Sequence, residues 1–137
     1  MICNKNICES LDELGCTPNK SLTLRFPNEK QLPKKFIRDF IRGYFDGDGC
    51  ISLDLDKRYS VIGFVGTKEF LEKISKILSE ELDIENPVLQ QKKGSKCWNL
   101  QYGSIVKCSK IYNYLYKDCN VYLDRKLEKF NTLFCLD

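Results

Sequence analysis

The 137-residue chain contains no histidine, and this absence excludes several kinds of catalytic site. Histidine is the base of Ser-His-Asp and Cys-His sites and a frequent zinc ligand. Any catalysis by this chain must therefore use carboxylates, lysines or a bound metal. The chain also lacks an apolar run of about 20 residues, the length that a membrane-spanning helix needs, so no membrane partner is expected.

The eight cysteines form no Cys-x-x-Cys pair, and no histidine is present to complete a zinc site with them. In a short secreted chain, that many cysteines would indicate a disulfide scaffold. The N-terminal residues, however, have acidic side chains early and no apolar segment of signal-peptide length. We therefore expect reduced, partly buried cysteines in a cytoplasmic or otherwise intracellular protein.

The length favours one domain with a real core, and the net charge of +3 suits an anionic partner without requiring one. Residues 1–32 predict a short helix at 7–14 and a linker, with too few apolar residues for a separate domain. This region resembles the remnant of something upstream. Residues 33–137 carry the periodic patterns and form the predicted domain.

Those patterns predict an α+β fold in the order helix, hairpin, helix, hairpin, helix, helix. Strands are expected at residues 50–56, 59–66, 87–93 and 97–103, and helices at 33–47, 67–82, from 104 and at 124–134. Two hairpins of this kind form one four-stranded antiparallel sheet with helices on one face. The other face is left open to water or a ligand.

The helix at residues 33–47 has apolar positions over roughly 200° of its circumference, wider than the ~100° stripe of a helix lying on one surface. We expect one side of it to pack on its own domain and the other side to pack on something else. Ile37, Ile41 and Phe45 form one stripe. The predicted dimer-interface side holds Phe36, Phe40, Gly43 and Gly47, and the polar arc holds Arg38, Asp39, Arg42 and Asp46.

Gly43 and Gly47 lie four residues apart on one face, the spacing that permits close approach of a second helix. An interior helical glycine costs roughly 1 kcal/mol relative to alanine, so Gly43 needs a packing reason. The simpler alternative for Gly47 and Gly49 is that they only end the helix before a turn.

The two aspartates of this segment have different predicted surroundings. Asp46 projects into the polar arc, where a local turn bond or a salt bridge with Arg42, four residues earlier, satisfies it. Asp48 projects to the packed side at the negative end of the helix dipole, where an unpaired carboxylate costs several kcal/mol. A cation between two symmetric Asp48 carboxylates explains that position, and Mg²⁺ prefers such oxygen ligands.

The helix followed by Ile-Arg-Gly-Tyr-Phe-Asp-Gly-Asp-Gly at residues 41–49 and then a hairpin resembles the LAGLIDADG homing endonucleases. Their motif ends in Asp-Gly-Asp-Gly or Asp-Ala-Asp-Gly, and their half-unit has the order αββαββα with a saddle-shaped sheet. The likeness extends from residue 33 to the C-terminus and includes residues 122–130. Residues 20–27 resemble the connection into the second half of two-motif members, which implies a single half that must dimerise.

The resemblance implies a site-specific endonuclease that hydrolyses double-stranded DNA. Asp48, with Gly49, would bind Mg²⁺ at the dimer axis, and a basic residue would stabilise the transition state. Arg125 and Lys126 match the region of that residue, although several relatives have lysine where this chain has Asp124. Lys107 is a weaker candidate.

The resemblance also implies that DNA lies on the open face of the sheet, with strands in the major groove. Each polar strand residue on that face is also consistent with an ordinary solvent-exposed position. A catalytically inactive DNA-binding regulator, an RNA-binding maturase and a plain dimerisation module remain alternative functions. The predicted DNA-binding residues are Ser52, Asp54, Asp56, Gln90, Lys92, Lys93, Lys96, Asn99 and Gln101.

Overall fold

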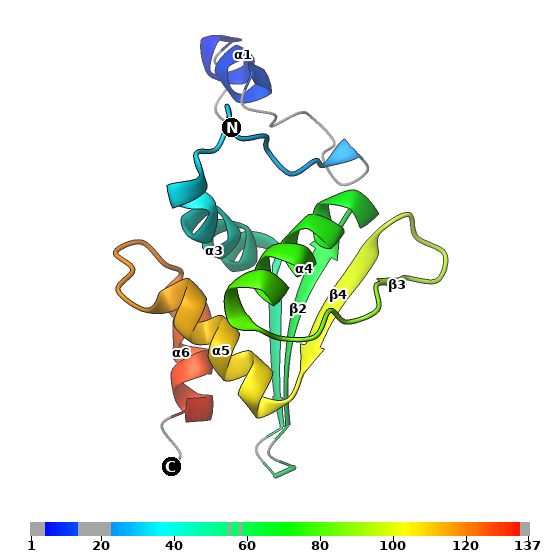
Figure 1. Ribbon diagram of the computed structural model, residues 1–137, viewed down its shortest axis with the longest axis vertical. Helices are drawn as coiled ribbons and strands as arrows, with labels where there is room; N and C mark the ends of the chain where they lie inside the picture. Colours follow the sequence, from blue (N-terminus) through cyan, green and yellow to red (C-terminus); the bar gives the residue numbers. More distant parts are fainter. Residues whose placement is uncertain (1–4, 14–22, 55, 58, 135–137) are drawn as a thin grey trace.

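The computed structural model describes residues 5–13, 23–54, 56–57 and 59–134 (Figure 1). The element order confirms the predicted α+β fold with the arrangement αββαββα. After α1 (Lys5–Glu13), the elements are α3 (Ile37–Asp48), β1 (Cys50–Asp54), β2 (Tyr59–Gly66), α4 (Lys68–Leu82), β3 (Gln90–Gln91), β4 (Trp98–Gly103), α5 (Ile105–Tyr116) and α6 (Asp124–Phe134).

The four strands form one antiparallel sheet in the order β1-β2-β4-β3. Figure 1 shows α4 lying over β2 and β4, and α3 and α5 also contact β2 from the helical side. The buried face of the sheet supplies Ile62, Phe64 and Leu100 to a core with buried residues from the helices. Hydrophobic burial thus accounts for one face of the sheet and leaves the other uncovered.

The second hairpin differs from its prediction in one strand. Residues 87–93 were expected to pair, but only Gln90 and Gln91 do so, opposite Asn99 and Trp98. Pro87 has no amide N–H to donate to a ladder, and Lys92 already belongs to the turn, where its amide donates to the Cys97 carbonyl. The predicted strand is therefore mostly an extended connection.

The first hairpin is shorter than predicted. β1 ends at Asp54, whose carboxylate accepts a hydrogen bond of 3.1 Å from the Lys57 amide. This bond closes the turn, as aspartate commonly does. Asp56 consequently lies in the turn and not in a strand, so its prediction as a sheet-face residue is wrong.

The helix predicted from Pro33 begins later, because Lys34–Phe36 form a 3₁₀ turn before α3. Ile41 and Phe45 are fully buried, as the apolar stripe predicted. Arg42, predicted on the polar arc, is also buried, at 6% exposure. α3 therefore buries a charged guanidinium, which needs hydrogen-bond acceptors within the fold.

Part of the predicted linker packs on the domain. Phe26 contacts Phe40 and Phe70, at ring-centroid distances of 5.2 and 5.7 Å. The Thr67 hydroxyl donates to the Leu24 carbonyl at 2.6 Å, and Thr67 also caps α4. Leu24 and Phe26 thus extend the packed unit beyond the N-terminal side of residue 33.

The expectations on cysteines and on membrane-spanning helices can be compared with the structure over the described ranges. Cys50, Cys97, Cys108 and Cys119 are free thiols there, as predicted for reduced cysteines. Among the helices of those ranges, none combines the length and the apolar composition needed to cross a bilayer.

Candidate metal and nucleic-acid site

The C-terminal end of α3 presents Asp48 together with an uncovered surface. Gly43, Gly47 and Asp48 are all exposed. A Cβ atom added at Gly43 or Gly47 would meet no atom within 4 Å. The face of α3 that carries these two glycines, called here the glycine face, is therefore open in a single chain and accessible to another helix.

Phe40 was predicted to face a partner, but its side chain packs within its own chain. Its ring packs against Phe26 and Phe70 of the same chain, and its side chain is half-buried. Phe36 is 44% exposed, with the Lys35 ammonium 4.9 Å from its ring centroid. Hydrophobic periodicity identified both as apolar positions, but it does not distinguish a residue's own core from a partner.

Gly49, the last residue of the motif, is buried against Phe45. Its amide donates to the Phe45 carbonyl at 2.9 Å, and its φ of −76° is accessible to any residue. A Cβ atom there would lie 2.2 Å from Phe45 Cδ2 and 2.6 Å from the Phe45 carbonyl oxygen. Close packing, not backbone conformation, therefore requires glycine at this position.

Gly49→Ala is expected to destabilise the fold by about 1–3 kcal/mol, because the clash includes a backbone atom that cannot rotate away. The free energy of unfolding of a dilute sample in urea measures this. Gly47→Ala is the matched control: its Cβ is unobstructed, and alanine should be neutral or stabilising by up to roughly 1 kcal/mol. Equal stability of Gly49→Ala and the parent would contradict the packing argument.

Lys126 in α6 reaches the motif from 77 residues further along the chain. It is only 7% exposed, its ammonium donates to the Gly49 carbonyl, and it lies 4.8 Å from the Phe45 ring centroid. Burial, then the nearby charge of Arg125, lowers the pKa of Lys126. The structure therefore brings one predicted basic residue to the residue next to Asp48.

The other basic candidates lie elsewhere. Arg125 is exposed on α6. Lys107 forms an ion pair of 3.4 Å with Glu85. Asp124 is the first residue of α6, where an acidic side chain is favourable to the helix dipole.

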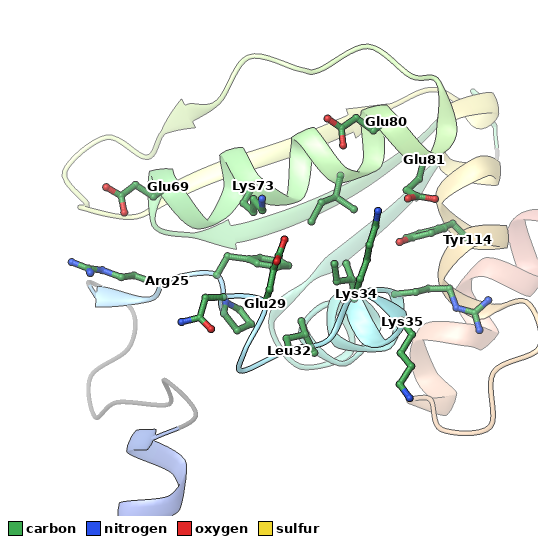
Figure 2. A pocket seen from close by; sticks show the side chains of 16 residues that line it. Arg25, Glu29, Leu32, Lys34, Lys35, Glu69, Lys73, Glu80, Glu81 and Tyr114 are labelled. Carbon is green, nitrogen blue, oxygen red and sulfur yellow. The ribbon is translucent and has the colours of Figure 1, made fainter.

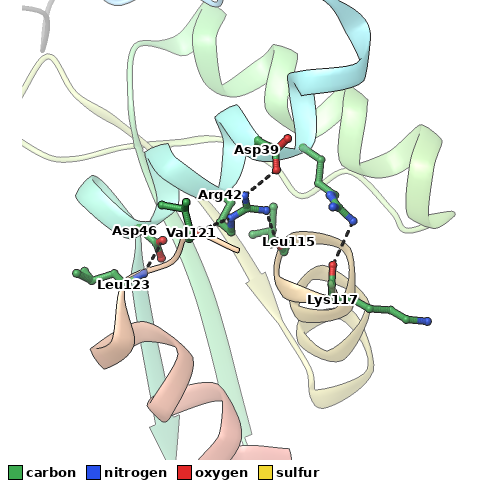
Figure 3. A network of polar contacts seen from close by, with 8 residues as sticks. Asp39, Arg42, Asp46, Leu115, Lys117, Val121 and Leu123 are labelled. Atoms are coloured by element: carbon green, nitrogen blue, oxygen red, sulfur yellow. Dashed lines mark hydrogen bonds and ion pairs between the residues drawn. The ribbon is translucent and has the colours of Figure 1, made fainter. Parts of the chain in front are cut away.

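Asp46 has non-local partners in place of the predicted local ones. Its carboxylate accepts from the Tyr116 hydroxyl at 2.5 Å. It also accepts from the Leu123 amide at 2.9 Å (Figure 3). Arg42 pairs instead with Asp39, at 2.6 Å. Burial of the Tyr116 hydroxyl and its bond to Asp46 raise the pKa of that tyrosine. The predicted Arg42–Asp46 contact is therefore wrong.

The described residues of one chain contain no group of three or more histidine, cysteine or acidic side chains that could hold a metal. Burial, and then the negative charge of Asp48, raise the pKa of Tyr44 to about 12. Its hydroxyl donates to the Val65 carbonyl. One chain thus offers a single motif carboxylate, with Gly49's carbonyl beside it.

The strand register places most of the predicted DNA-binding residues on one surface. Ser52, Asp54, Gln90, Asn99 and Gln101 share the uncovered side, called here the open face. Cross-strand neighbours in register lie on the same side of a sheet. The three predicted lysines lie at or beside the β3–β4 turn and are exposed: Lys92, Lys93 and Lys96.

Sequence reasoning missed the contribution of β2 to the open face. Tyr59, Val61 and Val65 lie there, opposite Asp54, Ser52 and Asn99. Tyr59 and Val65 are 52% and 38% exposed. Because both sides of β2 are largely apolar, alternation carried no signal there. A groove of about 240 Å³ on this face is lined by Tyr59, Val61, Pro87, Val88, Gln90, Asn99, Gln101 and Gly103.

A larger hollow lies on the helical side of the molecule. Its volume is about 1210 Å³, and it is lined by α4, α5 and residues 25–38 (Figure 2). Its charged residues are of both signs, including Lys34, Lys73, Glu69 and Glu80. None of the predicted catalytic or DNA-binding residues lines it.

Comparison with known proteins gives one family and a set of distant structures. The family model described as "LAGLIDADG-like domain" matches residues 35–117. A crystal structure of the homing endonuclease I-LtrWI bound to target DNA covers 96% of this chain and 55% of that one, at 11% identity and a TM-score of 0.53. A crystal structure of the homing endonuclease I-TnaI covers 70% of this chain and 67% of that one, at 16% identity and a TM-score of 0.48. The I-LtrWI similarity supports the fold.

Two curated relatives come from Methanocaldococcus jannaschii. A probable translation initiation factor IF-2 is 36% identical over 78 residues, which is 56% of this chain and 6% of that protein. A reverse gyrase is 41% identical over 58 residues, which is 42% of this chain and 3% of that protein. The chain thus matches only a small part of each relative's length.

Proposed function

The chain belongs to the LAGLIDADG family, and on that premise we propose that it is one half of a homing endonuclease that cuts double-stranded DNA with a divalent cation. Two copies, related by two-fold symmetry through their α3 helices, complete the site. Residues 33–137, with the packed residues 24 and 26, form the endonuclease unit.

The observation that carries this proposal is the placement of Asp48. Asp48 is the exposed last residue of α3, directly after Gly47 of the uncovered glycine face, and Lys126 donates to the carbonyl of the next residue, Gly49. Packing of two glycine faces brings two Asp48 carboxylates toward one axis. A dimerisation module alone requires neither the acid nor the buried lysine.

The donor atoms fit a hard divalent cation. Carboxylate and carbonyl oxygens are the ligands that Mg²⁺ prefers, and the remaining positions go to water and phosphate. The Gly49 carbonyl accepts from Lys126 and keeps a second lone pair. A bound cation supplies an activated water and stabilises negative charge on the phosphate. Asp48 holds the cation, and the Lys126 ammonium adds positive charge beside the phosphate.

DNA is placed on the open face. Polar groups at Ser52, Gln90, Asn99 and Gln101 suit the donor and acceptor pattern of the major groove. Val61 and Val65 add apolar contacts of the kind that thymine methyl groups make. Lysines at the β3–β4 turn suit phosphates. I-LtrWI has a similar fold, and its crystal structure shows that protein bound to target DNA, which supports this proposal.

Cleavage of a randomised duplex library, followed by sequencing of the cut ends, tests the proposal. With Mg²⁺, the parent chain is expected to produce ends at a recurrent sequence. With a chelator in place of Mg²⁺, it should produce none. A chain that binds duplex DNA but yields no ends with any divalent cation is a regulator and contradicts the proposed cleavage.

Gly43→Leu is expected to convert the dimer to a folded monomer, because the leucine blocks close approach of two α3 helices. Within one chain the new side chain meets open space, so folding should be retained. Light scattering measures the mass, and circular dichroism measures the fold. Lys76→Leu, on the exposed surface of α4, is the matched control and should remain dimeric. A parent chain that cuts both strands as a strict monomer would contradict the shared site.

A further inference from the structure

The connection between α5 and α6 is held against α3 by side chains. The Arg42 guanidinium donates to the Val121 carbonyl at 2.8 Å and to the Leu115 carbonyl at 2.9 Å. Asp46, one turn later on α3, accepts from the Leu123 amide at 2.9 Å (Figure 3). The connection therefore has anchors on both sides of residues 117–120.

Asp46 uses both of its carboxylate oxygens inside the chain. One accepts from the Tyr116 hydroxyl, and the other accepts from the Leu123 amide. Both bonds hold the Asp46 carboxylate to segments that lie at least 70 residues further along the chain. Asp46 is thus a structural acceptor within its own chain.

The Leu123 anchor fixes the start of α6. The Leu123 carbonyl accepts from the amides of Lys126 and Leu127, at 3.0 and 3.2 Å, and these bonds form the first turn of the helix. Lys126 lies in that turn, and its side chain extends back to Gly49. A displacement of Leu123 would be transmitted through these backbone bonds to the lysine, because a helical turn moves as a unit.

We propose that Asp46 is a positioning residue: by binding the Leu123 amide, it fixes the first turn of α6 so that the Lys126 ammonium reaches the Gly49 carbonyl beside Asp48. The effect on cleavage rests on the proposed function. The positioning itself rests on the contacts alone and has a readout of its own.

That readout is the side-chain ammonium resonance of Lys126 in protein labelled with [¹⁵N]lysine. A buried ammonium bonded to a carbonyl should exchange slowly, and loss of the signal in Lys126→Met assigns it. Asp46→Ala should lose this signal while the core stays folded. Asp46→Ser, whose hydroxyl is too short to reach the Leu123 amide, provides the same test if the alanine variant does not fold. A parent-like signal in either folded variant overturns the proposal.

Asp46→Asn is the conservative rescue. Its amide oxygen can accept from the Leu123 amide, and its NH₂ group can donate to the Tyr116 oxygen, so the Lys126 signal should be retained. Tyr116→Phe removes the other bond to Asp46 and leaves the Leu123 bond, so it should retain the signal as well. Loss of the signal in Asp46→Asn would mean that the charge of Asp46, and not its geometry, positions the lysine.

Kinetics separate positioning from general stability. Asp46→Ala should lower kcat on the order of 100-fold with little change in KM, since displacing a catalytic group by about 1 Å has that effect. In a Lys126→Met background, the same substitution should lower kcat no further. Additive losses overturn the proposal. If the parent itself does not cleave DNA, the proposed function fails, whereas the Lys126 resonance still tests the positioning.

Discussion

Asp48→Asn is expected to lower the rate of DNA cleavage on the order of 1000-fold or more. The amide keeps the size of the side chain and loses the negative charge that we propose binds a divalent cation. Losing a cation that contributes several kcal/mol of transition-state stabilisation has an effect of this size. The first-order rate constant for cutting a target selected from the library measures it, with saturating enzyme and Mg²⁺.

Two comparisons isolate the role of the carboxylate. Asp83→Asn changes an exposed aspartate at the end of α4, where φ is 51° and asparagine is well tolerated, so its cleavage rate should match the parent's. DNA affinity of Asp48→Asn, measured with a chelator present, should stay within a few-fold of the parent, because the open face is unchanged. Cleavage by Asp48→Asn at the parent's rate would remove Asp48 from the site.

Phe45→Ala is expected to lower the free energy of unfolding by about 3–5 kcal/mol. The ring is fully buried, and its centroid lies 5.3 Å from that of Phe64 and 5.8 Å from that of Phe130. Removing it leaves a cavity beside Gly49 and removes the aromatic ring that the Lys126 ammonium contacts. Urea denaturation of a dilute sample measures the change.

Phe36→Ala is the control for that substitution, because it removes the same side chain from a site that is 44% exposed. Its cost in a dilute sample should stay below about 1 kcal/mol. A similar small cost for Phe45→Ala would show that the end of α3 is not a packed part of the core.

The element order was predictable from the sequence because it depends on local patterns. Alternation in β1 and β4 identified the open face, and helical periodicity located α3, α4 and α6. The spacing of Gly43, Gly47 and Asp48 depends only on helical geometry. The structure finds these three residues exposed in one chain.

The surroundings of Arg42 and Asp46 could not be predicted, because their partners are distant in the sequence. The carbonyls that Arg42 satisfies lie 73 and 79 residues away, and the amide that Asp46 binds lies 77 residues away. Helical periodicity reports whether a position is polar, but a buried arginine that donates to backbone carbonyls has the same pattern as a solvated one.

Which of the two basic candidates contacts the motif depends on the phase of α6. Arg125 and Lys126 are adjacent, so their chemistry and position in the sequence left both as candidates. Adjacent helical residues do not share a face. The fold directs Lys126 to Gly49 and leaves Arg125 exposed, and the sequence contains no local signal for the contact that decides between them.

Mixing parent and Asp48→Asn chains tests the central claim, that two copies share one cutting site, most directly. The two chains are co-expressed in equal amounts and purified together, and the total number of strand breaks, nicks included, is compared with that made by the same total amount of parent. If each site needs two Asp48 carboxylates, random pairing leaves about one quarter of the dimers active, so activity should fall to about 25%. Activity of about 50% would mean that each chain cuts on its own and would contradict the shared site.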